Sequence, residues 1–98
     1  MNESKFPLGQ LVSTPAAIEA VNPDDMRNCL ARHAAADWGD LCEEDRNENE
    51  IALRSELRIF SVYRDREGVK FWIITEADRS STNVELHISR VMLSLQKC

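Results

Sequence analysis

The spacing of apolar and polar residues changes along the chain, and this change predicts helices first and strands later. In the first half, apolar side chains recur three or four residues apart, which is typical of one face of a helix. This stripe consists of Met26, Cys29, Leu30, His33, Ala34 and Trp38. Asn22 and Pro23 form a helix-start signal before the stripe, and Gly39 is a natural end after it. Thr14 and Pro15 repeat the start signal for a shorter helix upstream.

In the second half of the chain the apolar period shortens to two residues, which is the period of a β-strand. Two alternating segments, 57–64 and 69–76, flank a turn that contains Gly68, so they predict a β-hairpin. Both faces of this hairpin are apolar, and therefore both need cover. Alternation over 84–88 predicts a further strand, while Leu8, Leu11 and Val12 are enough apolar positions for a short strand or an extended segment.

These elements predict an α+β fold, in which two or three N-terminal helices pack on a small antiparallel sheet of three to four strands. A chain of 98 residues is long enough for one hydrophobic core, so residues 1–98 are expected to form a single small globular domain. Residues 1–7 are a polar lead-in to this domain. The tail, residues 90–98, fits the spacing of a helix and of a strand equally well.

Negative charge is concentrated in the middle of the chain. Residues 37–56 contain eight acidic and two basic residues, a net charge of −6, whereas the whole chain carries −5. Asp40 and Glu43 have the spacing of a capping box, which predicts that this segment begins a third helix. Only Leu41, Ile51 and Ala52 are expected to face inward. The carboxylates of this helix are therefore expected to form one negatively charged, solvated face.

The overall charge and composition narrow the classes of partner. A net charge of −5 and a pI of about 5.0 argue against direct nucleic-acid binding and against attraction to anionic membranes. No apolar run reaches the roughly 18 residues of a membrane helix, and the start of the chain lacks the apolar region of a secretory signal. The three cysteines are odd in number and irregularly spaced, unlike those of a disulfide framework. These features predict a cytoplasmic protein.

His33 is the main candidate for metal or catalytic chemistry. With Cys29 and Cys42 it could supply three zinc ligands, and with Asp37 and Asp40 it could form an acid–base group. Closely spaced ligand pairs such as Cys-x-x-Cys are absent, however, and His33 lies on the apolar stripe of its helix. The sequence therefore favours a core histidine, and it predicts no cofactor, no metal ligands and no catalytic residues.

Trp72 is a candidate of a different kind. It lies on the predicted hairpin together with Arg58, Arg64 and Lys70. An exposed tryptophan beside basic residues would be an interface anchor, whereas a buried one would belong to the core.

The chain also has a family resemblance, which rests on the segments RHAAADWGDL, EEDRNENE and WIITEADRS. Together with FPLGQLVSTPAAIEA and LRIFSVYR, they resemble a family of short bacterial proteins that are encoded on plasmids and integrative elements and are usually described as plasmid-related. The match covers residues 6–82, whereas residues 83–98 depart from the usual ending of the family. The resemblance implies cargo of a mobile genetic element, where small accessory proteins often counter host defence systems or regulate transfer.

The acidic run and the implied mobile-element setting together predict a non-enzymatic protein-binding function. A row of carboxylates can complement the basic groove of a host protein that handles nucleic acid, such as a restriction or CRISPR-type defence complex. The predicted contact residues are Glu43, Glu44, Asp45, Glu48 and Glu50, with Trp72 as the candidate anchor. Two alternatives stay open: a small enzyme or toxin that uses His33 with nearby carboxylates, and a homodimeric structural accessory protein.

Overall fold

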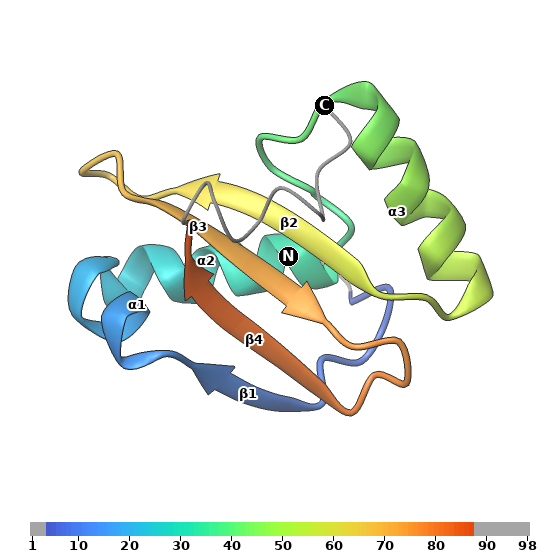
Figure 1. The fold of residues 1–98 in the computed structure, drawn as a ribbon, viewed down its shortest axis with the longest axis horizontal. Coiled ribbons are helices and arrows are strands. Elements are labelled where there is room, and N and C mark those ends of the chain that lie inside the picture. The colour runs from blue at the N-terminus through green and yellow to red at the C-terminus, as the bar shows by residue number, and fades with distance from the viewer. Residues whose placement is uncertain (1–3, 88–98) are drawn as a thin grey trace.

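The computed structural model describes residues 4–87, which form three helices and one four-stranded sheet (Figure 1). In chain order the elements are β1 (Gln10–Ser13), α1 (Pro15–Ala20), α2 (Pro23–Ala34), α3 (Glu43–Ser55), β2 (Ile59–Arg64), β3 (Lys70–Thr75) and β4 (Ser81–Leu86). The predicted α+β class is confirmed. Two finer predictions are wrong, because the helices do not all lie N-terminal to the strands and the sheet is mixed rather than wholly antiparallel.

The sheet has the strand order β1-β4-β3-β2. The hairpin of β2 and β3 is antiparallel as predicted, and β4 continues it in the antiparallel direction. β1 instead runs parallel to β4, with Gln10 opposite Ser81 and Ser13 opposite Val84. Alternation along a short segment reports which face it buries and not the direction of its partner, so the parallel pair was not predictable from spacing. The predicted tail, residues 90–98, and the last position of the predicted strand, Ile88, lie outside the described residues.

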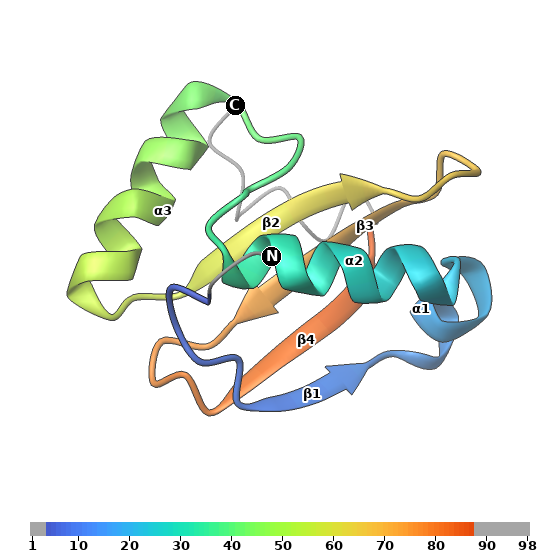
Figure 2. The same cartoon turned by 180° about the vertical axis from the view of Figure 1, so that it is seen from behind.

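Helices cover the sheet unevenly. α1 and α2 pack against one face, and α3 lies beside β2 at the edge of the sheet (Figures 1 and 2). One core cluster joins the α1–α2 layer to the sheet and consists of Ala17, Val21, Cys29, Tyr63, Phe71, Ile73 and Val84. The other cluster consists of Phe6, Trp38, Leu41, Ala52, Ile59, Phe60, Val62, Trp72 and Ile74. Since β2 and β3 are buried on both faces, the expectation of two-sided cover for the hairpin is confirmed.

The two predicted helix starts are confirmed. The hydroxyl oxygen of Thr14 accepts a hydrogen bond from the backbone N–H of Ala17 at 3.2 Å, and proline occupies the first turn of α1. The amide oxygen of Asn22 accepts from the backbone N–H groups of Asp24 and Asp25 at 3.0 and 3.2 Å. Local chemistry therefore determines where both helices begin.

The end of α2 differs from the prediction, because the helix stops at Ala34 and leaves Trp38 in a loop. Ala36 takes a left-handed backbone conformation with φ of 67°, and the backbone N–H of Asp37 then bonds to the carbonyl of Arg32 at 2.8 Å. The side chain of Asp37 also pairs with Arg32 at 2.8 Å. This turn ends the helix before the apolar stripe ends. Trp38 therefore reaches the core from the loop that follows the helix.

The same loop protects the outer edge of β2. Gly39 forms a parallel bridge with Val62, and the backbone N–H of Asp40 donates to the Val62 carbonyl at 2.7 Å. A side chain at position 39 would bring its Cβ to 2.1 Å from that carbonyl oxygen, so this position requires glycine.

Asn49 on α3 completes this protection. Its side-chain amide donates to the Phe60 carbonyl at 2.6 Å and accepts from the Phe60 N–H at 3.3 Å. The amide thus replaces a neighbouring strand at this position, and both outward backbone groups of Phe60 are satisfied.

Replacing Asn49 with alanine is expected to lower the free energy of unfolding by about 1–2 kcal/mol, because two buried backbone groups lose their partner. Urea denaturation measures this change. Asn47 is exposed on the same helix, so Asn47→Ala is the matched control and should change stability by no more than about 0.5 kcal/mol. Equal effects of the two substitutions would contradict the edge-protecting role of Asn49.

α3 begins without the predicted capping box. Its N-cap is Cys42, which makes no side-chain capping bond, and the helix starts at Glu43. Asp40 instead lies 3.3 Å from the guanidinium of Arg64 on β2. Among residues 4–87, no helix is long and apolar enough to cross a lipid bilayer.

Candidate functional site

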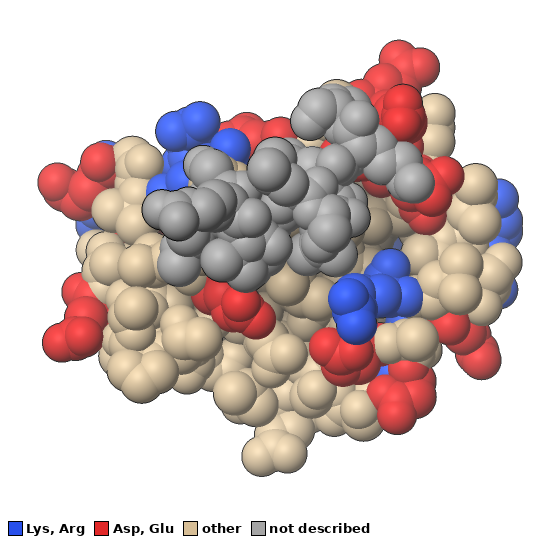
Figure 3. Space-filling view, in the orientation of Figure 1, with Lys and Arg blue, Asp and Glu red and all other residues tan. Residues whose placement is uncertain are grey.

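α3 has two faces with opposite environments. Asp45, Asn49 and Ala52 are buried, at positions that share one side of the helix. The rest of the helix surface is exposed and carries Glu43, Glu44, Glu48 and Glu50, which together are called the acidic face below. By helical spacing Glu44 and Glu48 lie on one flank of the buried side, and Glu43 and Glu50 lie on the other. Figure 3 shows acidic side chains gathered over this part of the molecule.

Asp45 does not belong to the acidic face, although the sequence placed it there. Its residue is only 1% exposed, so a partner protein cannot reach it and the prediction is wrong for this position. The reason is helical geometry, because Asp45 lies one turn before Asn49 and two turns before Ala52 on the inward side.

The acidic face is not neutralised by the described basic residues. No ion pair found among residues 4–87 involves a residue of α3. Arg46, the nearest base in the sequence, donates instead to the carbonyls of Leu41 and Gly39 at 2.8 and 2.9 Å. Glu43 and Glu44 are also in the first turn, where negative charge stabilises a helix.

Glu50 has a second role at the border of the acidic face. One of its carboxylate oxygens accepts a hydrogen bond from the indole N–H of Trp38 at 2.9 Å. This bond ties the middle of α3 to the loop that protects β2, so Glu50 contributes to the architecture as well as to the surface charge.

Ile51 lies among the exposed positions of α3, which corrects its predicted inward orientation. It is 44% exposed, whereas Leu41 and Ala52 are buried as expected. Ile51 is three residues after Glu48 and seven after Glu44, so helical spacing alone places it on the same side as those glutamates. The acidic face therefore has an apolar residue within it, a feature that a helical projection of the sequence could have shown.

His33 is fully buried and both of its ring nitrogens are occupied. Nδ1 lies 2.5 Å from the Ser61 hydroxyl, and Nε2 lies 2.9 Å from the Thr75 hydroxyl. The chain continues from Thr75 to the Thr82 hydroxyl at 2.7 Å, and Thr82 donates to the Leu8 carbonyl at 2.7 Å. Through these hydroxyl groups His33 connects α2 to β2, β3 and β4, and to the Leu8 carbonyl before β1.

This hydroxyl chain determines the tautomer of His33. A carbonyl can only accept, so the single hydroxyl proton of Thr82 is used toward Leu8. Thr75 must then donate to Thr82, and it accepts in turn from a proton on Nε2 of His33. The hydroxyl chain therefore requires a proton on Nε2. In the neutral ring Nδ1 then accepts a hydrogen bond from the Ser61 hydroxyl.

The environment of His33 disfavours its charged form. Burial of the ring, and secondarily the positive charge of Arg79, lower the pKa of His33 from 6.5 to about 3. A zinc ligand needs a free ring nitrogen, and this ring has none. Among residues 4–87, no group of three His, Cys, Asp or Glu side chains is arranged to hold a metal ion.

The predicted acid–base group is not assembled either. Asp37 pairs with Arg32, and this hydrogen bond lowers the pKa of the Asp37 carboxyl. Asp40 pairs with Arg64. Neither carboxylate contacts His33, whose two ring nitrogens face hydroxyl groups instead.

Trp72 is a core residue and not an exposed anchor. It is 0% exposed, its ring is stacked at 5.3 Å on Phe60, and the His87 ring lies parallel to it, also at 5.3 Å. The interface-anchor prediction is therefore wrong. Because both faces of the hairpin are buried, alternation could not distinguish a tryptophan on the exposed side from one in the core.

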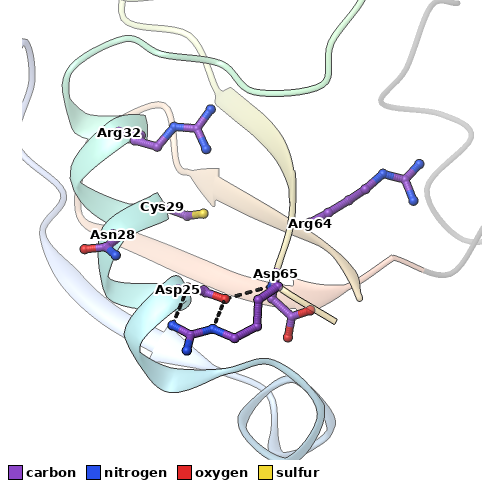
Figure 4. Close-up of a pocket in the computed structure, with 7 residues that line it drawn as sticks. Asp25, Asn28, Cys29, Arg32, Arg64 and Asp65 are labelled. Carbon is purple, nitrogen blue, oxygen red and sulfur yellow. Dashed lines mark hydrogen bonds and ion pairs between the residues drawn. The ribbon is translucent and has the colours of Figure 1, made fainter. Parts of the chain in front are cut away.

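A pocket of about 310 Å³ lies beside α2, at the turn between β2 and β3, and sequence spacing did not predict it (Figure 4). Its lining residues are Asp25, Asn28, Cys29, Arg32, Arg64, Asp65 and Arg66. Asp25 binds Arg66 through both its guanidinium and its backbone N–H, and the hydrogen bond with Arg66 lowers the pKa of Asp25. Each of the three arginines pairs with an aspartate.

Cys29 is the one nucleophilic side chain among these lining residues. Burial raises the pKa of its thiol, which keeps the sulfur protonated. With its cations paired and its thiol protonated, the pocket supplies neither an activated nucleophile nor an uncompensated anion site.

Comparison of the chain with protein-family models, curated proteins and solved structures finds no match. The arrangement of the described residues is therefore the basis for a functional proposal, and its most distinctive surface is the acidic face of α3.

Proposed function

We propose that this chain is a small, non-enzymatic accessory protein of a mobile genetic element, and that it binds a host protein through the acidic face of α3. The partner presents a basic surface of the kind that nucleic-acid-handling complexes use, such as a restriction or CRISPR-type defence complex. The protein acts in the cytoplasm and inhibits that complex by occupying the surface, without binding nucleic acid itself.

The observation that carries the proposal is the uncompensated charge of the acidic face. Four glutamates project from one rigid helix, and no described arginine or lysine pairs with them. A fixed array of carboxylates attracts a basic surface over long range, and it competes with the phosphates that the same surface binds. A flexible acidic tail would lose more conformational entropy on binding.

Ile51 adds an apolar contact within this charged surface. Protein interfaces commonly combine a buried apolar centre with a polar rim, and Ile51 with Glu44 and Glu48 has this composition on a small scale. In the proposed complex Ile51 contacts the partner directly, while the glutamates set the orientation.

The alternative of a small enzyme or toxin receives no support from His33. A catalytic group must reach a substrate, whereas this ring is fully buried and bonded at both nitrogens.

The double substitution Glu44→Lys/Glu48→Lys tests the proposal. It is expected to weaken binding to the partner by tenfold or more, on the order of 1.4 kcal/mol, because attraction across the interface becomes repulsion. The partner is first captured from a host lysate by the unaltered protein at low and high salt and identified by mass spectrometry. Its affinity for each variant is then measured with purified proteins, and added salt is expected to weaken binding.

A matched control has the same change in net charge on other surfaces. Glu19 and Glu67 are both exposed and lie outside α3, so Glu19→Lys/Glu67→Lys should leave the affinity nearly unchanged. Circular dichroism checks that both double variants stay folded. Equal loss of affinity in the two double variants would show that only overall charge matters, and normal binding by Glu44→Lys/Glu48→Lys would rule out the acidic face as the site.

A further inference from the structure

β1 is the outermost strand of the sheet, and its outer edge is open. The backbone N–H groups of Gln10 and Thr14 donate inward, to the carbonyls of Ser80 and Val84 at 3.0 and 3.1 Å. Because strand residues point their backbone groups alternately to the two sides, those of Leu11 and Ser13 point outward. β1 forms the margin of the sheet in both views, and within residues 4–87 no group bonds to this edge (Figures 1 and 2).

The opposite edge of the same sheet is closed. The outward N–H and carbonyl of Phe60 bond to Asn49, and those of Val62 bond to the loop at Trp38 and Asp40. Exposed sheet edges promote association with other strands, and proteins commonly cover them or place charge and proline on them. Among the residues that the structure describes, the edge of β2 is protected at each of these positions and the edge of β1 is not.

The open edge is apolar and uncharged. Leu11 and Val12 are 55% and 45% exposed, which makes them two of the large hydrophobic residues at the surface. Residues 6–18 contain no Asp, Glu, Lys or Arg, and no proline interrupts β1. An edge of this composition presents both the hydrogen-bonding groups and the apolar side chains that another strand needs.

The edge of β1 can accept a second copy of the chain without bringing like charges together. Each copy carries a net charge of −5, so two copies repel one another wherever their carboxylates meet. Residues 6–18 contain no charged side chain, so this repulsion is smallest where two β1 edges meet. A two-fold axis also brings the same surface from both copies together, which is the commonest arrangement of protein dimers.

We propose that β1 pairs antiparallel with β1 of a second copy, so that the two four-stranded sheets become one eight-stranded sheet. In the register that uses all of the outward groups, Leu11 of each copy lies opposite Ser13 of the other and exchanges two backbone hydrogen bonds with it. Val12 then meets its own counterpart on the two-fold axis, at a position without backbone hydrogen bonds, where side chains are closest.

This surface is separate from the acidic face. α3 lies beside β2, at the other end of the strand order, so both copies of α3 stay exposed in the dimer (Figure 1). The inference therefore does not depend on the proposed function of α3, and either can fail without the other.

The register makes a specific experiment possible. Val12→Lys and Val12→Glu each place like charges together on the axis, so each variant alone is expected to be monomeric in analytical ultracentrifugation. An equimolar mixture of the two variants is expected to form a heterodimer, because opposite charges then meet. The unaltered chain and Val12→Thr are expected to reach twice the monomer mass of 11.2 kDa within a concentration series that extends to about 1 mM.

Hydrogen exchange on the unaltered chain provides a second measurement that needs no variant. The amides of Leu11 and Ser13 are expected to become protected as the protein concentration rises, while exposed amides of α3 do not change. A monomeric mass for the unaltered chain at about 1 mM would overturn the proposal. So would a dimer that persists in both charged variants, or concentration-dependent protection confined to residues outside β1.

Discussion

Replacing Trp72 with alanine is expected to lower the free energy of unfolding by about 3–5 kcal/mol, the largest effect expected for any substitution considered in this protein. The side chain is fully buried and lies between the rings of Phe60 and His87. Its removal takes away the apolar burial and leaves a cavity that the surrounding sheet can fill only in part. Since small domains have total stabilities of about 5–15 kcal/mol, this loss is a large fraction of the whole.

Trp72→Phe is the informative second variant, because burial of the indole N–H of Trp72 lowers the stability of the folded chain. Its indole N–H is buried without a hydrogen-bond partner among the described residues, and such a donor costs about 1–3 kcal/mol. Phenylalanine keeps most of the ring packing and removes this donor, so the two effects oppose one another. Trp72→Phe is therefore expected to stay within about 1 kcal/mol of the unaltered protein.

Urea denaturation of the two variants decides between the core and anchor roles of Trp72. A core residue makes Trp72→Ala unstable, whereas an exposed anchor would lose partner binding and keep its stability. Retention of full stability by Trp72→Ala would contradict the buried position. A large loss in Trp72→Phe would mean that the indole N–H has a hydrogen-bond partner.

The second large effect is a loss of stability in mild acid, caused by His33. In the folded chain the pKa of His33 is about 3, and in the unfolded chain it returns to its usual value of 6.5. Between these two pH values the unfolded chain binds one more proton, so the free energy of unfolding falls as the pH falls. Above pH 6.5 the ring is neutral in both states, and His33 then contributes no pH dependence.

The expected size of the effect follows from this difference in pKa. Each pH unit below 6.5 removes about 1.4 kcal/mol, which amounts to about 2 kcal/mol between pH 7.5 and pH 5 and more than 3 kcal/mol by pH 4. Urea denaturation at several pH values measures the slope. Above about pH 5 the change in the free energy of unfolding comes mainly from histidine. Carboxyls with lowered pKa values stabilise the folded chain at these pH values and lose this contribution only at lower pH; they belong to Asp25, Asp37, Asp65 and Asp78.

Two substitutions test whether this dependence of the unfolding free energy on pH comes from the ring of His33. His33→Gln is expected to be less stable at pH 7.5 and to depend much less on pH between 7.5 and 5, because the group with the larger pKa shift is gone. The pKa of His87 is also lowered, by partial burial and by Lys70 and Arg64, so His87→Gln should keep most of the slope. An unchanged slope in His33→Gln would show that His33 is not a buried neutral group.

Several features of this protein follow from short stretches of sequence. Thr14 with Pro15 and Asn22 with Pro23 determine two helix starts, because a capping side chain and a first-turn proline act on backbone groups within three residues. The alternating segments around Gly68 likewise predicted the hairpin and its burial on both faces.

The candidate surface was predictable only in part. Helical spacing indicates which residues share a side of α3, and by that rule Asp45 and Ile51 could have been assigned correctly. Residue type suggested the reverse, since an acid is expected outside and an isoleucine inside. Residue type misleads where the fold buries a polar residue at an inward helical position, as it does with Asp45 and Asn49.

The sequence by itself determined the helix starts, the hairpin and the local excess of negative charge, because each depends on residues close together in the chain. Only the tertiary structure decided that β1 joins β4 in parallel, that Asn49 closes the edge of β2, and that His33 is held between Ser61 and Thr75. These contacts join residues 11 to 71 positions apart along the chain. Periodicity reports which side of an element is buried, whereas the identity of the partner depends on how all of the elements pack together.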